Sequence, residues 1–335
     1  MKVIFFSVII LFAVAVMELA CGSSGFGLPE VFTENSGLSE DPFGGENAEI
    51  TGTEINPVFR LRLLRTAAAV GVGGALALAG LLLQSVLKNP LADPFVLGIS
   101  GGAAAGAGMV MLTGLAVLTP FAVSGGAFGG AVVVLLLVML FSGGVRSGER
   151  LLLSGVMTGS LARAVLMIMT ALCNDSRKIA GVSRWMLGDF QAPQVEMLLL
   201  LWIALVIGAI IAVCGAKALN VISFDDERAF FLGFDPVKYS RIFAVVAALL
   251  TAFSVAVAGI IGFCGLVVPH CVKKVLGTDH RKVVVPVFLW GGIFLGMCDS
   301  ISAIMPAGVN LPAGVITAAV GAPVFLWILN CRRKI

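Results

Sequence analysis

Ten long apolar runs dominate this chain and restrict what it can fold into. Most are close to the roughly 20 residues that a helix needs to cross a hydrocarbon core of about 30 Å. They cover residues 3–17, 63–87, 95–113, 116–141, 151–172, 195–216, 241–258, 260–272, 284–303 and 312–330. Only 12% of the residues are charged, about half of the roughly 25% typical of soluble domains. The pattern predicts an all-α integral membrane protein with about ten transmembrane helices, the short run 260–272 being a partial or tilted span.

The first apolar run follows Lys2 and predicts a transmembrane helix over residues 1–21. A cleaved signal peptide is the alternative, because the small residues Ala20-Cys21-Gly22 come directly after the run. Residues 22–57 are polar, Gly-rich and acidic, so we expect an extracytoplasmic loop with little fixed structure. The membrane domain then extends over residues 58–335.

Basic residues are distributed unevenly between the connections of these runs. If the N-terminus is inside, most of the 22 Lys and Arg residues fall on inner connections or near the two termini. Membrane proteins carry such an excess on their cytoplasmic side, so we expect both termini in the cytoplasm. The outer basic residues form two groups, at 60–65 and 177–184, which need a separate explanation.

A short polar turn, residues 88–94, interrupts the apolar sequence between Gln84 and the Gly-rich run that follows. Pro90 and Pro94 each remove a backbone donor and stop a helix from continuing through the turn. Irregular backbone at a membrane is tolerated only where protein or water covers it. The turn is therefore a tight reversal at the membrane surface or a segment beside a water-filled path.

No catalytic or metal-binding pattern is visible in the sequence. There is no phosphate-binding P-loop and no HExxH motif, and the seven cysteines form no CxxC pair. The two histidines, His270 and His280, are interpreted as interfacial polar residues. A net charge of +3 argues against nucleic acid as a partner. We therefore expect neither an enzyme nor a bound cofactor.

Charged residues inside the apolar runs are few, and each is a candidate functional group. Arg163 lies near the centre of its run and has no obvious carboxylate partner, so a pathway role and a packing role are both open. The acids nearest to the membrane interior are Glu18 and Asp299. An ion-coupled secondary transporter, which buries carboxylates at mid-membrane, is therefore the alternative to the function inferred below.

The largest inner connection, residues 217–241, contains the pattern of a short helix. Acidic residues at 225–227 precede an apolar cluster at 230–232, and Gly233 ends it. Such a segment predicts a docking element for another protein. A helix lying on lipid is the alternative, but its acidic start disfavours anionic lipid.

Several motifs, in order, resemble the signature of the FecCD/BtuC-type permeases, the membrane subunits of ABC importers for iron chelates, haem and cobalamin. The first half carries Arg62-Leu63-Leu64-Arg65, the segment from Gly80 to Gln84, Asn89-Pro90-Leu91-Ala92-Asp93-Pro94, and Leu97-Gly98 to Gly102-Ala103. The second half carries Gly262-Phe263-Cys264-Gly265-Leu266-Val267-Val268-Pro269-His270, Gly277-Thr278-Asp279-His280-Arg281, Asp299, Leu311-Pro312-Ala313-Gly314-Val315 and Gly321-Ala322-Pro323-Val324-Phe325. The resemblance covers residues 57–330.

This resemblance implies a type II ABC importer permease fold of ten transmembrane helices in a prokaryotic cell membrane. It implies a homodimer, or a pair of paralogous permeases, that works with two cytoplasmic ATPase subunits and an extracytoplasmic binding protein. The permease itself would catalyse no reaction, and ATP hydrolysis would take place in the ATPases.

The resemblance also assigns roles to residues. Arg62 and Arg65 would dock the binding protein, although Leu64 replaces the family's proline and Ala303 replaces a further docking arginine. Arg60, or the group Arg177, Lys178 and Arg184, would then contribute to docking.

The cytoplasmic gate would be Asn89, Pro90 and Leu91, with the segment Ser147–Arg150 opposite. Within the connection 220–240, the ATPase contact would involve Asp226, Glu227, Ala229, Leu232 and Gly233. Gln84 and Arg163 are the candidates to line the pathway.

Overall fold

The computed structural model describes residues 2–20, 57–117, 119, 121–143, 148–190, 193–305 and 311–331, and in these residues all regular structure is helical. The elements are α1 (Lys2–Ala20), α3 (Pro57–Val86), η1 (Pro94–Leu97), α4 (Ile99–Thr113), η2 (Leu115–Val117), α5 (Ala122–Phe141), α6 (Gly148–Leu172), α7 (Ser176–Met186), α8 (Val195–Cys214), α9 (Ala216–Ile222), α10 (Asp226–Phe231), α11 (Pro236–Ala258), α12 (Cys264–Leu276), α13 (His280–Ile304) and α14 (Ala313–Cys331).

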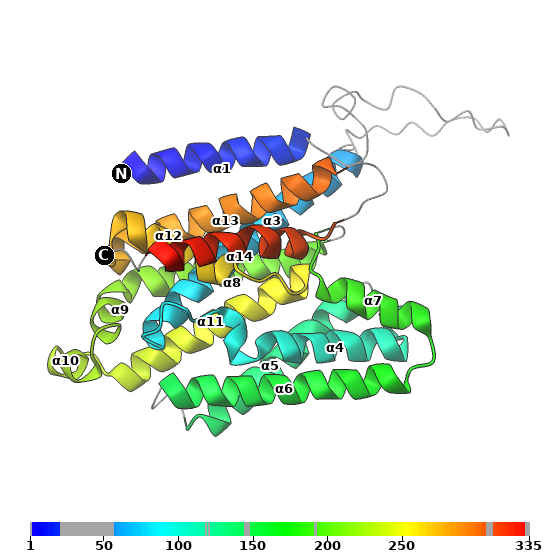
Figure 1. Ribbon diagram of the computed structural model, residues 1–335, viewed down its shortest axis with the longest axis horizontal. Coiled ribbons are helices and arrows are strands. Elements are labelled where there is room, and N and C mark those ends of the chain that lie inside the picture. Colours follow the sequence, from blue (N-terminus) through cyan, green and yellow to red (C-terminus); the bar gives the residue numbers. More distant parts are fainter. Residues whose placement is uncertain are drawn as a thin grey trace, which may run out of the picture.

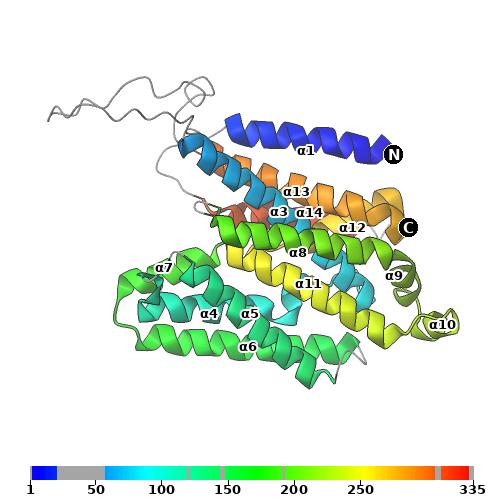
Figure 2. The same cartoon turned by 180° about the vertical axis from the view of Figure 1, so that it is seen from behind.

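α3 is the central helix of the bundle. Its most apolar window is 94% buried, whereas the corresponding windows of α5 and α6 are 28% buried. It packs against α8, α11, α12 and α13. Figures 1 and 2 show α1 and α6 on opposite outer faces of the bundle. The polar turn that ends α3 is therefore attached to the most buried helix of the described chain.

Glycines allow α3 to approach its neighbours closely. A Cβ atom at Gly80 would lie 1.8 Å from the carbonyl oxygen of Gly265 on α12, and one at Gly73 would lie 2.3 Å from that of Gly291 on α13. Any larger residue at these positions would separate the helices. Small residues serve the same purpose in membrane helix pairs generally, because dispersion contacts hold such pairs together.

The bundle has two ends of different character. α9 and α10 lie at one end, which we call the α10 end, and α1 starts and α14 finishes there (Figure 1). α7 lies at the opposite end, which we call the α7 end. α7 is a short helix with a charged face and begins at the cap residue Asp175, whose carboxylate accepts from the backbone of Arg177 and Lys178. Sequence analysis did not predict this helix.

Each of the ten predicted runs falls on a helix in the described part of the chain. Six helices are long and apolar enough to cross a membrane, namely α3, α5, α6, α8, α11 and α13, and α1, α4 and α14 contain shorter apolar stretches. Three α-helices begin four or more residues after the start of their predicted runs, whereas α3, α11 and α13 begin four or more residues before it. A 3₁₀ turn at 94–97 precedes α4, α5 begins at Ala122 rather than at 116, and the run from 260 becomes helical only at Cys264. The last difference follows from the positive φ angles of Gly259 and Phe263, which no helix accommodates.

Some predictions concern segments outside the described residues. These are the extracytoplasmic loop up to residue 56, the small residues 21 and 22 after the first helix, Ser147 of the segment opposite the gate, and the basic tail at 332–334.

Candidate functional site

The polar turn after α3, residues 87–93, is held by its own hydrogen bonds, and we call it the gate turn. The amide of Asn89 donates to Gln84 O at 3.1 Å, and Asn89 Oδ1 accepts from the amide of Leu91 at 2.9 Å. Lys88 has a φ angle of 50°, at a position after a helix where Gly or Asn is usual. Asp93 Oδ1 then caps the 3₁₀ turn by accepting from Phe95 N at 2.8 Å. The turn thus has a defined shape, with Leu91 projecting from it as an exposed apolar side chain.

α10 is a short helix that presents an apolar tip, formed by Phe230, Phe231 and Leu232. Asp225 caps the helix by accepting from the amide of Glu227 at 3.0 Å. Ala229 faces inward and is fully buried, whereas the three tip residues are 70%, 85% and 65% exposed. Gly233 follows with a φ angle of 83°, which glycine adopts without strain. A cluster of three large exposed apolar side chains at a polar helix is typical of a contact surface for another protein.

The gate turn and α10 touch each other. Lys88 Nζ lies 3.0 Å from Asp226 Oδ1, although 138 positions separate these residues in the sequence. Both side chains are partly exposed, and such a pair contributes only about 0.2–1 kcal/mol to stability. The contact matters because of its position, since it joins the gate turn after α3 to α10, which carries the apolar tip.

A buried polar network lies behind this contact and joins α3, α9 and α13. His280 Nδ1 is 2.7 Å from Asn220 Oδ1, and His280 Nε2 is 2.7 Å from Ser85 Oγ. Because an amide oxygen can only accept, the proton of the neutral ring lies on Nδ1, and the Ser85 hydroxyl shares its hydrogen between Nε2 and Leu81 O, which is 2.8 Å from Ser85 Oγ. Asn220 Nδ2 in turn donates to Asp279 Oδ1 at 2.8 Å. Sequence analysis interpreted His280 as interfacial, but it is only 2% exposed and belongs to this network.

The two arginines predicted to dock a binding protein both lie at the α7 end and both have partners within the chain. Arg65 forms two hydrogen bonds with Asp299, Nε–Oδ2 at 2.6 Å and Nη2–Oδ1 at 2.8 Å. Arg62 is 7% exposed and donates from Nη1 to Leu19 O at 2.9 Å. Glu18 on α1 is also buried close to this group. These side chains tie α1, α3 and α13 together, while Arg60 remains exposed.

The two predicted pathway residues lie in different surroundings. Gln84 is buried, and its Nε2 makes long contacts with the carbonyl oxygens of Gly265 and Leu266 on α12, at 3.4 and 3.3 Å. Arg163 lies on the exposed face of α6, where its Nη2 is 3.3 Å from Ser160 Oγ. The same face carries the exposed apolar residues Leu153, Met157, Leu161 and Met167. The structure does not bring Gln84 and Arg163 together.

No metal-binding group of three or more His, Cys, Asp or Glu side chains occurs within the described residues. The candidate site is an arrangement of contacts, namely the gate turn, the apolar tip of α10, the arginines at the α7 end and the exposed face of α6.

Comparison with known proteins gives consistent relatives over nearly the whole chain. The FecCD transport family matches residues 8–330. The chain is 33% identical over 324 residues to YvrB of Bacillus subtilis, an uncharacterized ABC transporter permease protein, covering 95% of this chain and 90% of that protein. It is 36% identical over 272 residues to BtuC of Salmonella typhimurium, a vitamin B12 import system permease protein, covering 81% and 83% of the two chains.

Solved structures give the same fold. The fold resembles that of a metal-chelate type ABC transporter in an inward-facing conformation, with a TM-score of 0.83, 24% identity and 98% of both chains covered. PsaBC from Streptococcus pneumoniae, solved in complex with Fab, is more distant, with a TM-score of 0.55, 18% identity and 79% and 90% of the two chains covered.

Proposed function

The chain belongs to the FecCD transport family and is the permease subunit of an ABC importer, and we propose that it moves an iron chelate, haem or cobalamin into the cytoplasm. The related permease BtuC belongs to a vitamin B12 import system. The metal-chelate type of the structurally similar transporter agrees with a chelated metal as cargo. ATP would be hydrolysed in separate ATPase subunits, a proposal supported by a sequence without a phosphate-binding P-loop.

The observation that carries the proposed mechanism is the contact between Lys88 and Asp226 at 3.0 Å. In this mechanism the α10 end faces the cytoplasm, and the apolar tip of α10 binds an ATPase subunit. Movement of α10 on ATP binding or hydrolysis is passed through Asp226 to Lys88 and so to Asn89, Pro90 and Leu91. The basic residues clustered at the α10 end support this orientation.

The exposed face of α6 supports a dimer. A charged side chain facing lipid near the middle of a bilayer is costly, so such residues usually face a protein interior or a water-filled cavity. Arg163 is the sixteenth residue of the 25-residue helix α6 and is exposed in the single chain. A second permease copy across this face would remove Arg163 from lipid and place it beside a central pathway.

Docking of the binding protein is proposed at the α7 end. Arg62 and Arg65 already bind partners in the chain, so they would offer only part of their donor capacity to a partner carboxylate. Arginine has five N–H donors, and Asp299 uses two of those on Arg65. The exposed Arg60 would supply a further full charge.

Two experiments test the proposal. The permease is first purified with its ATPase from membranes, and Leu232→Asp is compared with Val117→Asp, an exposed apolar residue in η2, which follows α4 near α7. We expect the ATPase to be lost only from the first variant.

Transport of labelled cobalamin, haem and ferric siderophore is then measured in proteoliposomes with the binding protein. Uptake that needs no ATP and follows a proton or sodium gradient would favour the secondary transporter and overturn the proposal.

Docking is tested by the affinity of the binding protein for Arg60→Glu, Arg62→Glu and Arg65→Glu variants. We expect each charge reversal to weaken binding, with Arg60→Glu leaving the thermal stability of the permease unchanged. Unaltered affinity in all three variants would contradict the docking assignment.

A further inference from the structure

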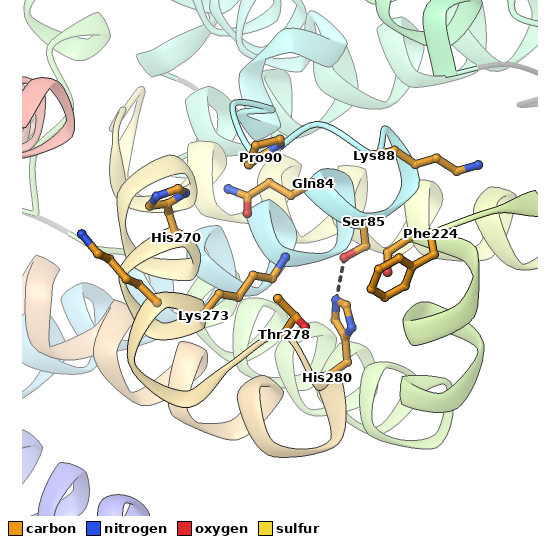
Figure 3. Close-up of a pocket in the computed structure, with 11 residues that line it drawn as sticks. Gln84, Ser85, Lys88, Pro90, Phe224, His270, Lys273, Thr278 and His280 are labelled. Carbon is orange, nitrogen blue, oxygen red and sulfur yellow. Dashed lines mark hydrogen bonds between the residues drawn. The ribbon is translucent and has the colours of Figure 1, made fainter. Parts of the chain in front are cut away.

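A basic cavity lies at the α10 end, between the end of α3 and the start of α13. Its volume is about 390 Å³. Five basic side chains and one amide define it: Gln84, Lys88, His270, Lys273, Lys274 and His280. No carboxylate lines this cavity among the residues that the structure describes (Figure 3).

Most of these basic groups already have a neighbour. Lys88 pairs with Asp226, and His280 belongs to the network with Ser85 and Asn220. Lys274 lies 5.8 Å from the centre of the Trp327 ring, a cation–π contact.

Lys273 is different, because it forms no ion pair with a described carboxylate. Burial lowers its pKa to about 8, so at pH 7 the ammonium is still mostly protonated. The cavity thus holds a half-buried cation without a counter-charge. A cation that has lost part of its hydration is stabilised by a nearby anion, and this lysine therefore points to an anionic ligand.

A second group in the cavity lacks a partner. Gln84 is only 4% exposed, and its Oε1 has no hydrogen-bond partner within the described part of the chain. The contacts of Nε2 with α12 fix the orientation of the amide, which leaves Oε1 to accept from something else. Figure 3 shows Gln84 and Lys273 directed into the same cavity. A ligand for this cavity must both carry negative charge and donate a hydrogen bond.

We propose that the basic cavity binds a phosphate group with an adjacent hydroxyl, its charged oxygens contacting Lys273 and its hydroxyl donating to Gln84 Oε1. Inorganic phosphate meets this requirement through its P–OH group. The headgroup of phosphatidylglycerol meets it through its glycerol hydroxyls, and basic pockets at the cytoplasmic face of membrane proteins bind lipid headgroups of this kind. Sulfate and simple carboxylates lack the hydroxyl at neutral pH and would leave Gln84 Oε1 unpaired. The proposal goes beyond the transport function and does not depend on the identity of the cargo.

Two carboxylates lie near the cavity without lining it, and both are already bound. Asp226 pairs with Lys88, and Asp279 accepts from Asn220 Nδ2 and from the amide of Arg281. They reduce the positive potential at the rim but leave Lys273 available.

The test uses the full-length permease, with any subunits that purify with it, in a maltoside detergent free of phosphorus. Binding of inorganic phosphate is followed by broadening of its ³¹P resonance, with sulfate as competitor. Lys273→Gln removes the charge, Lys273→Arg keeps it, and Lys217→Gln removes an exposed charge on α9 as the matched control. A second arm places the same variants in nanodiscs of phosphatidylcholine doped with phosphatidylglycerol and counts retained phosphatidylglycerol by native mass spectrometry.

We expect saturable binding that weakens about tenfold in Lys273→Gln, the loss of one charge-assisted hydrogen bond. Lys273→Arg and Lys217→Gln should bind as the wild type does, and sulfate should compete about tenfold less well than phosphate. Binding in the first arm assigns the site to free phosphate, and binding only in the second assigns it to the lipid headgroup.

The proposal is overturned if the wild type binds neither probe, if Lys273→Gln binds as tightly as wild type, or if sulfate competes equally. The wild-type and sulfate measurements decide the question even if Lys273→Gln does not fold.

Discussion

Arg65 on α3 and Asp299 on α13 form an ion pair with two hydrogen bonds, although 234 positions separate them in the sequence. Asp299 is 1% exposed, so its charge is compensated by this arginine rather than by water. Two parallel N–H···O bonds are the strongest arrangement of these groups. The pair therefore fixes the α7 end of two helices that pack extensively on each other.

Replacing Asp299 by Asn is expected to destabilise the permease strongly. Removing one member of a buried pair leaves the other charge uncompensated, at a cost of about 3–5 kcal/mol. Thermal unfolding of the purified chain in detergent measures the loss, with the exposed Arg60→Gln as control. An unfolding temperature for Asp299→Asn equal to that of the control would contradict this role.

Two glycine-to-alanine substitutions are expected to change the stability of the folded protein in opposite directions. In Gly80→Ala the new Cβ would lie 1.8 Å from Gly265 O, and α3 would have to move away from α12. Overpacking of this kind costs about 1–3 kcal/mol or more. At Gly129 on α5 a Cβ would meet nothing within 4 Å, so alanine should stabilise the helix by up to about 1 kcal/mol. Thermal unfolding compares the two, and equal effects would argue against close packing at Gly80.

His280→Ala is expected to loosen the junction of α3, α9 and α13. It removes the imidazole contacts of Ser85 and Asn220 from a buried site, while Ser85 Oγ keeps Leu81 O and Asn220 Oδ1 keeps the backbone amide of residue 280. Each lost hydrogen bond costs about 0.5–1.5 kcal/mol, and the space left by the ring adds to this cost. Amide hydrogen exchange should then rise in residues 216–222 and 280–284. The exposed Lys282→Ala, on the same turn of α13, should leave exchange unchanged, and similar exchange in both variants would refute the role of the network.

Hydropathy and local patterns predicted the long apolar helices and α10, but not α7. The ten apolar runs all fall on helices, because burial in lipid or protein demands apolar residues along the whole length of a span. The acidic start, apolar cluster and glycine of residues 225–233 predicted α10 for a different reason, because helix caps and helix breakers act through local sequence. The family resemblance is confirmed by relatives that cover most of the chain.

Contacts between distant segments were not accessible to this reasoning. Neither the pair of Lys88 with Asp226 nor that of Arg65 with Asp299 leaves a local pattern, because each depends on how the helices pack. His280 was misjudged because its two partners lie on other helices. Lys88 adopts a positive φ angle where sequence rules favour glycine or asparagine, so the shape of the gate turn could not be derived from residue preferences.

Charge reversal at Lys88 and Asp226 tests the link between α10 and the gate turn. Lys88→Glu and Asp226→Lys each place like charges about 3 Å apart, which should push the gate turn away from α10. Because exposed pairs contribute only about 0.2–1 kcal/mol, the folded protein should keep its stability. Only the transmission of movement from α10 to the gate turn should be impaired.

ATP-driven uptake in proteoliposomes containing the ATPase and the binding protein is the decisive measurement. We expect each single reversal to lower uptake several-fold while ATPase binding persists, and the double variant Lys88→Glu/Asp226→Lys to restore it. Single variants that transport as well as the wild type, or a double variant no better than the singles, would contradict the proposed coupling.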